Sequence, residues 1–189
     1  MTPKRPIYGE SALLTPANLM TAFRIVIAPV FIWLIVARGA SWWTFVVGAG
    51  AGMSDYLDGI VARRHGPTRS GAFLDPLADK VAVLGAMFAL VWVGTMALVP
   101  VLLILAREVW MTWYRAHQSK SGVSIPARSL PKLKTLVQDF AIAFCVFPPT
   151  RQVTDLQEAT LWCAVLLTVV TGVQYYLDGR RAQLAAAAT

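Results

Sequence analysis

Charge is scarce in this sequence, and acidic residues are the scarcer kind. Asp, Glu, Lys and Arg make up 14% of the 189 residues, whereas soluble domains usually carry about 25%. Hydrophobic residues reach 57%, and a soluble fold of this length has too little interior to bury them. The composition therefore excludes an ordinary soluble domain and predicts one domain embedded in a lipid bilayer.

Cysteine and histidine are also rare, with two of each. Cys145 and Cys163 lie inside apolar stretches and show neither a Cys/His metal spacing nor a disulfide framework. We interpret both as small apolar packing residues. No apolar stretch with a cleavage site follows Lys4 and Arg5, so we expect no cleavable signal peptide.

The net charge of +7 raises the question of nucleic acid. The basic residues punctuate apolar segments and form no stripe with interleaved aromatic residues, so we expect no nucleic-acid partner. An anionic lipid surface or a phosphate-bearing substrate accounts for the charge better.

Six segments approach the roughly 20 apolar residues that a membrane-spanning helix needs: about 19–37, 42–63, 75–94, 97–113, 135–147 and 156–176. The expected fold class is an all-α integral membrane protein, a six-transmembrane-helix bundle with a short N-terminal interfacial helix. We expect an N-terminal segment 1–18, a membrane domain 19–178 and a cytoplasmic tail 179–189 whose Ala-rich end is frayed. Small residues in the second segment would allow close helix packing: Gly48, Gly50 and Gly52.

Basic residues gather in alternate connections between these segments, which predicts the orientation of the chain. The second connection holds Arg63, Arg64 and Arg69, and the fourth holds Arg115, Lys120, Arg128, Lys132 and Lys134. We therefore expect a multi-pass protein of the cell membrane, with both termini and the even-numbered connections in the cytoplasm.

Four aspartates stand out because carboxylates at membrane depth are costly and usually functional. Asp55 and Asp58 are three residues apart and Asp75 and Asp79 are four apart, so each pair shares one face of a helix. Both pairs lie near the cytoplasmic ends of consecutive segments joined by a short loop. Antiparallel packing would bring all four carboxylates together.

A divalent cation would relieve the repulsion between these carboxylates. An all-oxygen set without Cys or His favours Mg²⁺, Mn²⁺ or Ca²⁺ over zinc. Four acids suit one or two ions, and a pair of ions is the usual arrangement for displacement at phosphorus. Two alternatives remain: an interfacial salt-bridge network with neighbouring Arg and Lys, and a cation channel or transporter. The gathering of the acids at one membrane face argues against a channel.

Small residues lie among the acids. Gly59 follows Asp58, and Ala62 and Arg63 come one turn later. The small residues leave room for a bulky ligand, and the guanidinium of Arg63 would hold its phosphates. The pattern predicts a pyrophosphate site beside a metal.

The pattern Asp55-x-x-Asp58-Gly59-x-x-Ala62-Arg63, followed by Gly71-x-x-x-Asp75-x-x-x-Asp79, closely resembles the signature of the CDP-alcohol phosphotransferases. The intervening loop, residues 64–70, is one residue shorter than is usual there. Other segments resemble the bacterial phosphatidylglycerophosphate synthase branch of that family: the entry from Pro16 to Arg24, the pair Arg107-Glu108, and Lys132-x-Lys134-Thr135-x-x-Gln138, with Pro131 where Gly is usual.

The resemblance implies roles for individual residues. Asp55, Asp58, Asp75 and Asp79 would bind Mg²⁺ or Mn²⁺, with Asp79 also the general base. Contacts to CDP-diacylglycerol would come from Asn18, Thr21, Gly59, Ala62, Arg63, Thr68 and Gly71. A small phosphorylated alcohol, glycerol 3-phosphate, would accept the phosphatidyl group at Arg107, Lys132 and Lys134.

Several alternatives stay open at this point. A cardiolipin-synthesising or an inositol-phosphate-using member of the same family would share the aspartates but take a different acceptor. Lys132 and Lys134 have a second interpretation as anchors of a helix end at the lipid headgroups. The resemblance also implies a homodimer, but no residue indicates its interface.

Overall fold

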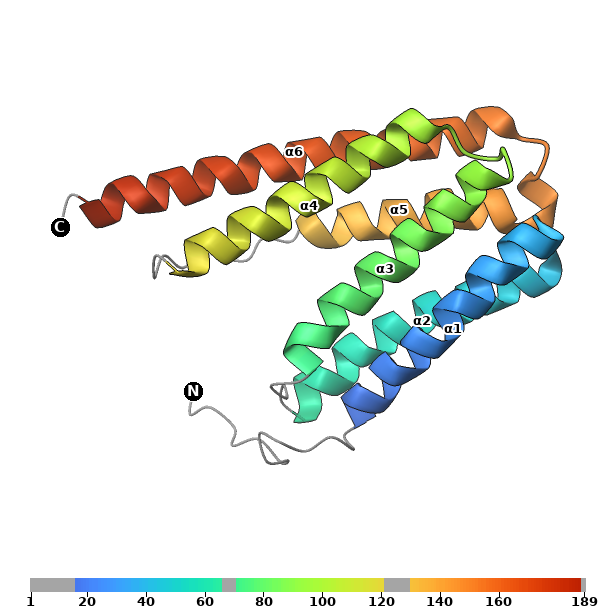
Figure 1. The fold of residues 1–189 in the computed structure, drawn as a ribbon, viewed down its shortest axis with the longest axis horizontal. Helices are drawn as coiled ribbons and strands as arrows, with labels where there is room; N and C mark the ends of the chain where they lie inside the picture. Colours follow the sequence, from blue (N-terminus) through green and yellow to red (C-terminus); the bar gives the residue numbers. More distant parts are fainter. Residues whose placement is uncertain (1–15, 66–70, 121–129, 188–189) are drawn as a thin grey trace. The chain divides into compact units, whose positions relative to one another are not determined.

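The computed structural model describes residues 16–65, 71–120 and 130–187, and the regular structure within these ranges is helical (Figure 1). The helices in chain order are α1 Pro16–Arg38, α2 Trp42–His65, α3 Gly71–Trp92, α4 Leu98–Lys120, α5 Leu130–Val146, the short 3-10 helix η1 Pro148–Thr150, and α6 Thr154–Ala187. The all-α class is confirmed for this part of the chain. The expected interfacial helix before the first span falls largely on residues 1–15, outside the described ranges.

The chain divides into two compact units. The first runs to Thr95 and includes residues 142–152, so it contains α1, α2, α3, the end of α5 and η1. The second comprises residues 96–141 and those from Val153 onward, so it contains α4, most of α5, and α6.

In the first unit, α1 packs against both α2 and α3 through glycines (Figure 1). A Cβ atom added to Gly48 of α2 would lie 2.6 Å from the ring of Phe31 on α1, and one added to Gly85 of α3 would lie 2.7 Å from Ile32. At these separations, a side chain on either glycine would force the facing side chain of α1 to move. Close packing is confirmed for Gly48, but a Cβ at Gly50 or Gly52 would meet no atom of the described residues within 4 Å, so the expectation is wrong for these two.

Local hydrogen bonds fix the ends of two helices in this unit. The Ser41 hydroxyl accepts a 3.2 Å hydrogen bond from the Thr44 amide, which caps the start of α2. At the end of α3, Gly94 adopts a φ of +75°, a conformation that glycine tolerates best. Thr95 N–H then donates to Leu90 O and Gly94 N–H to Val91 O, the Schellman pattern that closes a helix.

Several helices extend beyond the segments expected from hydropathy. Helix α4 continues to Lys120, α5 begins at Leu130, and α3 begins at Gly71 instead of near Asp75. The expectation of a frayed Ala-rich end is wrong as far as Ala187, where α6 ends. Alanine has the highest intrinsic helix propensity, and hydropathy reports the preference for lipid, not the extent of backbone hydrogen bonding.

Residues 154–181 of α6 form the one helical segment of the described ranges that is long and apolar enough to cross a membrane by length and composition. Residues 80–92 of α3 form a shorter apolar helix. Polar residues such as Arg107 and Glu108 interrupt α4, which lowers its mean hydropathy. The all-helical architecture is consistent with a membrane protein, in which such polar residues face protein and not lipid.

The two cysteines are free thiols in different surroundings. Cys145 is buried in α5, so its interpretation as a packing residue is confirmed. Cys163 is exposed on α6, so the same interpretation is wrong for it. Its exposed neighbours on α6, Trp162 and Leu166, are also apolar, as a lipid-facing surface requires.

Candidate functional site

The four aspartates lie on two helices of the first unit. Asp55 and Asp58 belong to α2, and Asp75 and Asp79 belong to the first turns of α3. Because both segments are helical, the three- and four-residue spacings place each pair on one helix face, as expected. Their side chains fall outside the described part of the structure, so their convergence remains a prediction.

The chemistry of these four residues fits a divalent metal. Four carboxylates form an all-oxygen donor set that suits hard cations such as Mg²⁺ and Mn²⁺. Because α3 begins at Gly71, Asp75 stands within the helix and keeps the four-residue spacing to Asp79. The backbone is therefore compatible with the expected metal site.

The residues expected to contact the CDP-lipid lie on the same three helices. Asn18 and Thr21 belong to α1, the group Gly59, Ala62 and Arg63 belongs to α2, and Gly71 begins α3. Thr68 lies outside the described ranges, as do the side chains of Asn18, Thr21, Ala62 and Arg63. Their contacts with a ligand remain predictions.

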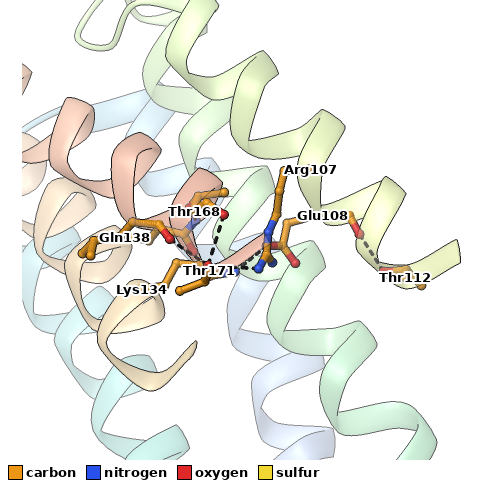
Figure 2. Close-up of polar contacts among 8 residues, drawn as sticks. Arg107, Glu108, Thr112, Lys134, Gln138, Thr168 and Thr171 are labelled. Atoms are coloured by element: carbon orange, nitrogen blue, oxygen red, sulfur yellow. Dashed lines mark hydrogen bonds and ion pairs between the residues drawn. The ribbon is translucent and has the colours of Figure 1, made fainter. Parts of the chain in front are cut away.

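Two of the expected acceptor residues, Arg107 and Lys134, lie close together in the second unit (Figure 2). Arg107 Nη1 on α4 donates a 2.9 Å hydrogen bond to Glu108 Oε1, and Lys134 Nζ on α5 donates to the same oxygen. One carboxylate thus joins two cations from different helices. Lys132 lies in the first turn of α5, and its side chain falls outside the description.

Helix α6 supplies the remaining partners of this polar cluster. Arg107 Nη2 donates to Thr171 Oγ1 at 3.0 Å, and Gln138 Nε2 on α5 donates to Thr168 Oγ1 at 3.2 Å. Figure 2 shows these side chains converging from the three helices. We call Arg107, Glu108, Lys134, Gln138, Thr168 and Thr171 the polar cluster of the second unit.

The polar cluster is almost completely removed from solvent. The side chains of Arg107 and Glu108 are 11% and 10% exposed, and Lys134 is also buried. A buried charge is tolerated only when it is paired and hydrogen-bonded. Among the six residues of the polar cluster, two cations share one carboxylate.

Residues 14–170 match the family described as CDP-alcohol phosphatidyltransferase. The match covers most of the chain, including the four aspartates and nearly all of the polar cluster. The chain belongs to the CDP-alcohol phosphatidyltransferase family. It is therefore an enzyme of that family, and the resemblance carried by the aspartate pattern is confirmed.

Proteins from several bacteria are similar to this chain over most of its length. A protein of Mycobacterium tuberculosis, "Probable phosphatidylglycerophosphate synthase", is 36% identical over 178 residues, which cover 89% of this chain and 83% of the relative. A CDP-diacylglycerol–glycerol-3-phosphate 3-phosphatidyltransferase of Rickettsia typhi is 33% identical over 169 residues, covering 84% and 93%. One of the same name from Shigella flexneri is 33% identical over 178 residues, covering 88% and 95%.

Sequence reasoning overlooked the contribution of α6 to this phosphatidyltransferase. Thr168, Thr171 and Gly172 interrupt an otherwise apolar segment, and residues three and four apart share a helix face. Polar and small residues within a membrane helix often mark contacts with another helix. That signal was available in the sequence, but it does not reveal which residue lies opposite.

Proposed function

We propose that this enzyme transfers a phosphatidyl group from CDP-diacylglycerol to glycerol 3-phosphate, producing phosphatidylglycerophosphate and CMP for phospholipid synthesis. The names of the relatives support this reaction. The observation that carries the choice of acceptor is the pairing of Arg107 and Lys134 around one buried carboxylate. Guanidinium and ammonium groups are well suited to bind the phosphate of a soluble acceptor.

In the proposed reaction, CDP-diacylglycerol lies with its acyl chains in the bilayer and its nucleotide near Asn18 and Thr21. Gly59, Ala62, Arg63, Thr68 and Gly71 complete the proposed lipid-nucleotide site. The carboxylates of Asp55, Asp58, Asp75 and Asp79 would hold one or two Mg²⁺ or Mn²⁺ ions, which supply charge stabilisation at the pyrophosphate oxygens.

Asp79 is proposed to accept the proton of the acceptor hydroxyl. The hydroxyl oxygen forms a bond to the phosphorus that carries the diacylglycerol. The bond from that phosphorus to the bridging oxygen breaks, and CMP leaves with this oxygen. Arg107, Lys134 and Lys132 hold the acceptor phosphate throughout, so their role is orientation and not proton transfer.

We further propose six membrane-spanning helices, both termini and the active site on the cytoplasmic side of the cell membrane, and a homodimer. The domain limits would be a 1–18 segment, a membrane domain 19–178 and a 179–189 tail. The apolar surface of α6 and the positive connections support this arrangement.

The deciding experiment supplies purified enzyme with CDP-diacylglycerol and one acceptor at a time, and follows CMP release. We expect stimulation by glycerol 3-phosphate, little by phosphatidylglycerol or an inositol phosphate, and loss of activity with EDTA that Mg²⁺ or Mn²⁺ restores. Stimulation by phosphatidylglycerol alone would establish a cardiolipin synthase instead. Ion flux in liposomes without CMP release would establish a channel.

A pair of variants tests the acceptor residues. Lys134→Met removes a cation of the polar cluster, and we expect the KM for glycerol 3-phosphate to rise about tenfold or more, because a charge-assisted contact is lost. Arg115→Met is the matched control, since Arg115 is exposed and its Cζ lies over the ring of Tyr175, 4.9 Å from the ring centroid. Equal KM values in the two variants would contradict the assignment of Lys134.

A further inference from the structure

Two of the three guanidinium nitrogens of Arg107 have hydrogen-bond acceptors. Nη1 donates to Glu108, the next residue of α4, and Nη2 donates to Thr171 of α6. With Glu108 as its one partner, the guanidinium could still rotate about the hydrogen bond from Nη1 to Glu108 Oε1. The second hydrogen bond, from a different helix, fixes the plane of the group.

The Thr171 hydroxyl is suited to a cation because its own hydrogen is already engaged. Its Oγ1 lies 2.7 Å from Leu167 O and 3.1 Å from Thr168 O, both carbonyl acceptors of the preceding helical turn. A hydroxyl has one hydrogen to donate, so the oxygen acts toward Arg107 only as an acceptor.

Gly172 provides the space in which the Arg107 side chain lies along α6. A Cβ atom at this position would lie 3.2 Å from Arg107 Nε and 3.5 Å from its Cγ, the first distance being tighter than ordinary contact. Nε is buried and has no hydrogen-bond partner among the described residues. The glycine therefore admits the side chain and leaves the terminal nitrogens as its ligand-binding atoms.

We propose that Thr171 and Gly172 are positioning residues that orient the guanidinium of Arg107 toward the phosphate of the acceptor. This proposal rests on the proposed function, in which Arg107 binds that phosphate. Nη1 and Nη2 of Arg107 each carry two hydrogens, and the described contacts use one hydrogen on each nitrogen. The second hydrogen of each nitrogen can therefore be donated to a ligand. A phosphate monoester has oxygens enough to accept both.

The test compares four variants of the full-length enzyme. Thr171→Val removes the oxygen that faces Arg107, Thr171→Ser keeps it, and Gly172→Ala crowds Nε. Thr160→Val is the matched control, because the Thr160 hydroxyl on the same helix bonds to Leu156 O and Gln157 O. For each variant, kcat and the KM values for CDP-diacylglycerol and for glycerol 3-phosphate are measured.

We expect Thr171→Val to raise the KM for glycerol 3-phosphate about tenfold, the effect of losing one charge-assisted hydrogen bond. Its kcat and its KM for CDP-diacylglycerol should change less than about twofold, because Arg107 acts on acceptor binding. Thr171→Ser and Thr160→Val should resemble the unmodified enzyme, and Gly172→Ala should shift the same KM by a smaller factor.

Equal acceptor KM values for Thr171→Val and Thr160→Val would overturn the proposal, as would an equal rise in the KM of both substrates. If Thr171→Val does not fold, Gly172→Ala decides, and an unchanged acceptor KM overturns the proposal. The thermal midpoint gives a second readout, because glycerol 3-phosphate should raise it less in the affected variants. Failure of glycerol 3-phosphate to stimulate or stabilise even the unmodified enzyme would instead refute the proposed function.

Discussion

The helices inside each of the two units of this phosphatidyltransferase pack through different kinds of contact. In the first, α1 packs on its neighbours through apolar contacts at Gly48 and Gly85. In the second, charged and hydroxyl groups of α4, α5 and α6 bond to one another in the interior. Apolar contacts carry no desolvation penalty for charge, whereas a buried charged network is stable only when it is fully paired.

In the first unit, different residues serve packing and the proposed reaction, whereas in the second unit the same residues serve both. In the first unit, the glycines that pack the helices are not the aspartates proposed for catalysis. In the second unit, Arg107 and Lys134 are proposed to bind the acceptor and also pair with Glu108 in the interior. Substitutions in the first unit should therefore change either turnover or stability, and loss of a charged residue of the polar cluster in the second should change acceptor binding and stability together.

The largest effect is expected for Asp79→Asn. The amide cannot take the proton of the acceptor hydroxyl, and general base catalysis contributes about 10²- to 10⁴-fold. We expect turnover to be abolished, with kcat lower by about 10³-fold, while some binding of CDP-diacylglycerol remains. CMP release and a binding assay on the same preparation measure the two properties. Near-normal turnover would show that another group is the base.

Glu108→Ala should affect both properties in the second unit. The change leaves two buried cations without their shared carboxylate, and such a loss destabilises a protein by about 3–5 kcal/mol. We expect a lower thermal midpoint together with a higher KM for glycerol 3-phosphate. Glu158→Ala, at an exposed position of α6, is the control. A drop in stability without any change in acceptor KM would show that stability and acceptor binding are separate in the second unit as well.

Gly48→Ala should affect stability alone. The new methyl group would lie 2.6 Å from the ring of Phe31, and overpacking of this kind costs about 1–3 kcal/mol. Denaturation in detergent should reveal the loss, with unchanged KM values in the folded fraction. Gly50→Ala is the matched control on the same helix, because its methyl group meets no atom within 4 Å in the part of the chain that the structure describes. It should be neutral or slightly stabilising.

The smallest effect is expected for the pair Gln138 and Thr168. Their 3.2 Å hydrogen bond is buried, and a neutral bond of this kind contributes about 1 kcal/mol. Gln138→Leu and Thr168→Val should each lower stability, and the double variant should lose less than the two losses added together. Strict additivity of the unfolding free energies would mean that the two side chains do not depend on one another.

The sequence predicted the helical class and the helices that carry the aspartates, because spacing along a helix fixes which residues share a face. It did not predict which glycine is needed for packing. Gly48 and Gly50 lie on different sides of α2, and the sequence does not show which side α1 covers. The contact with Phe31 of α1 shows that it is the side of Gly48. Helix ends such as Ala187 were missed because hydropathy does not measure backbone hydrogen bonding.

The acceptor residues show the same limit. Arg107, Lys132 and Lys134 were expected together from the resemblance, and the structure joins Arg107 and Lys134 through Glu108. The partner of Arg107 on α6 lies 64 residues further along the chain. No local pattern specifies a contact of that separation, because it depends on the register in which two helices pack.

The unequal surroundings of the two thiols give this enzyme a built-in reporter of membrane immersion. Cys145 is enclosed, while Cys163 stands on the outer surface of α6, so a nitroxide reagent should attach at one place without any engineered cysteine. Power-saturation spectroscopy with oxygen, which concentrates in lipid, and with a water-soluble nickel complex would then read the depth of that residue directly. A label deep in the hydrocarbon would establish α6 as a spanning helix in the native sequence.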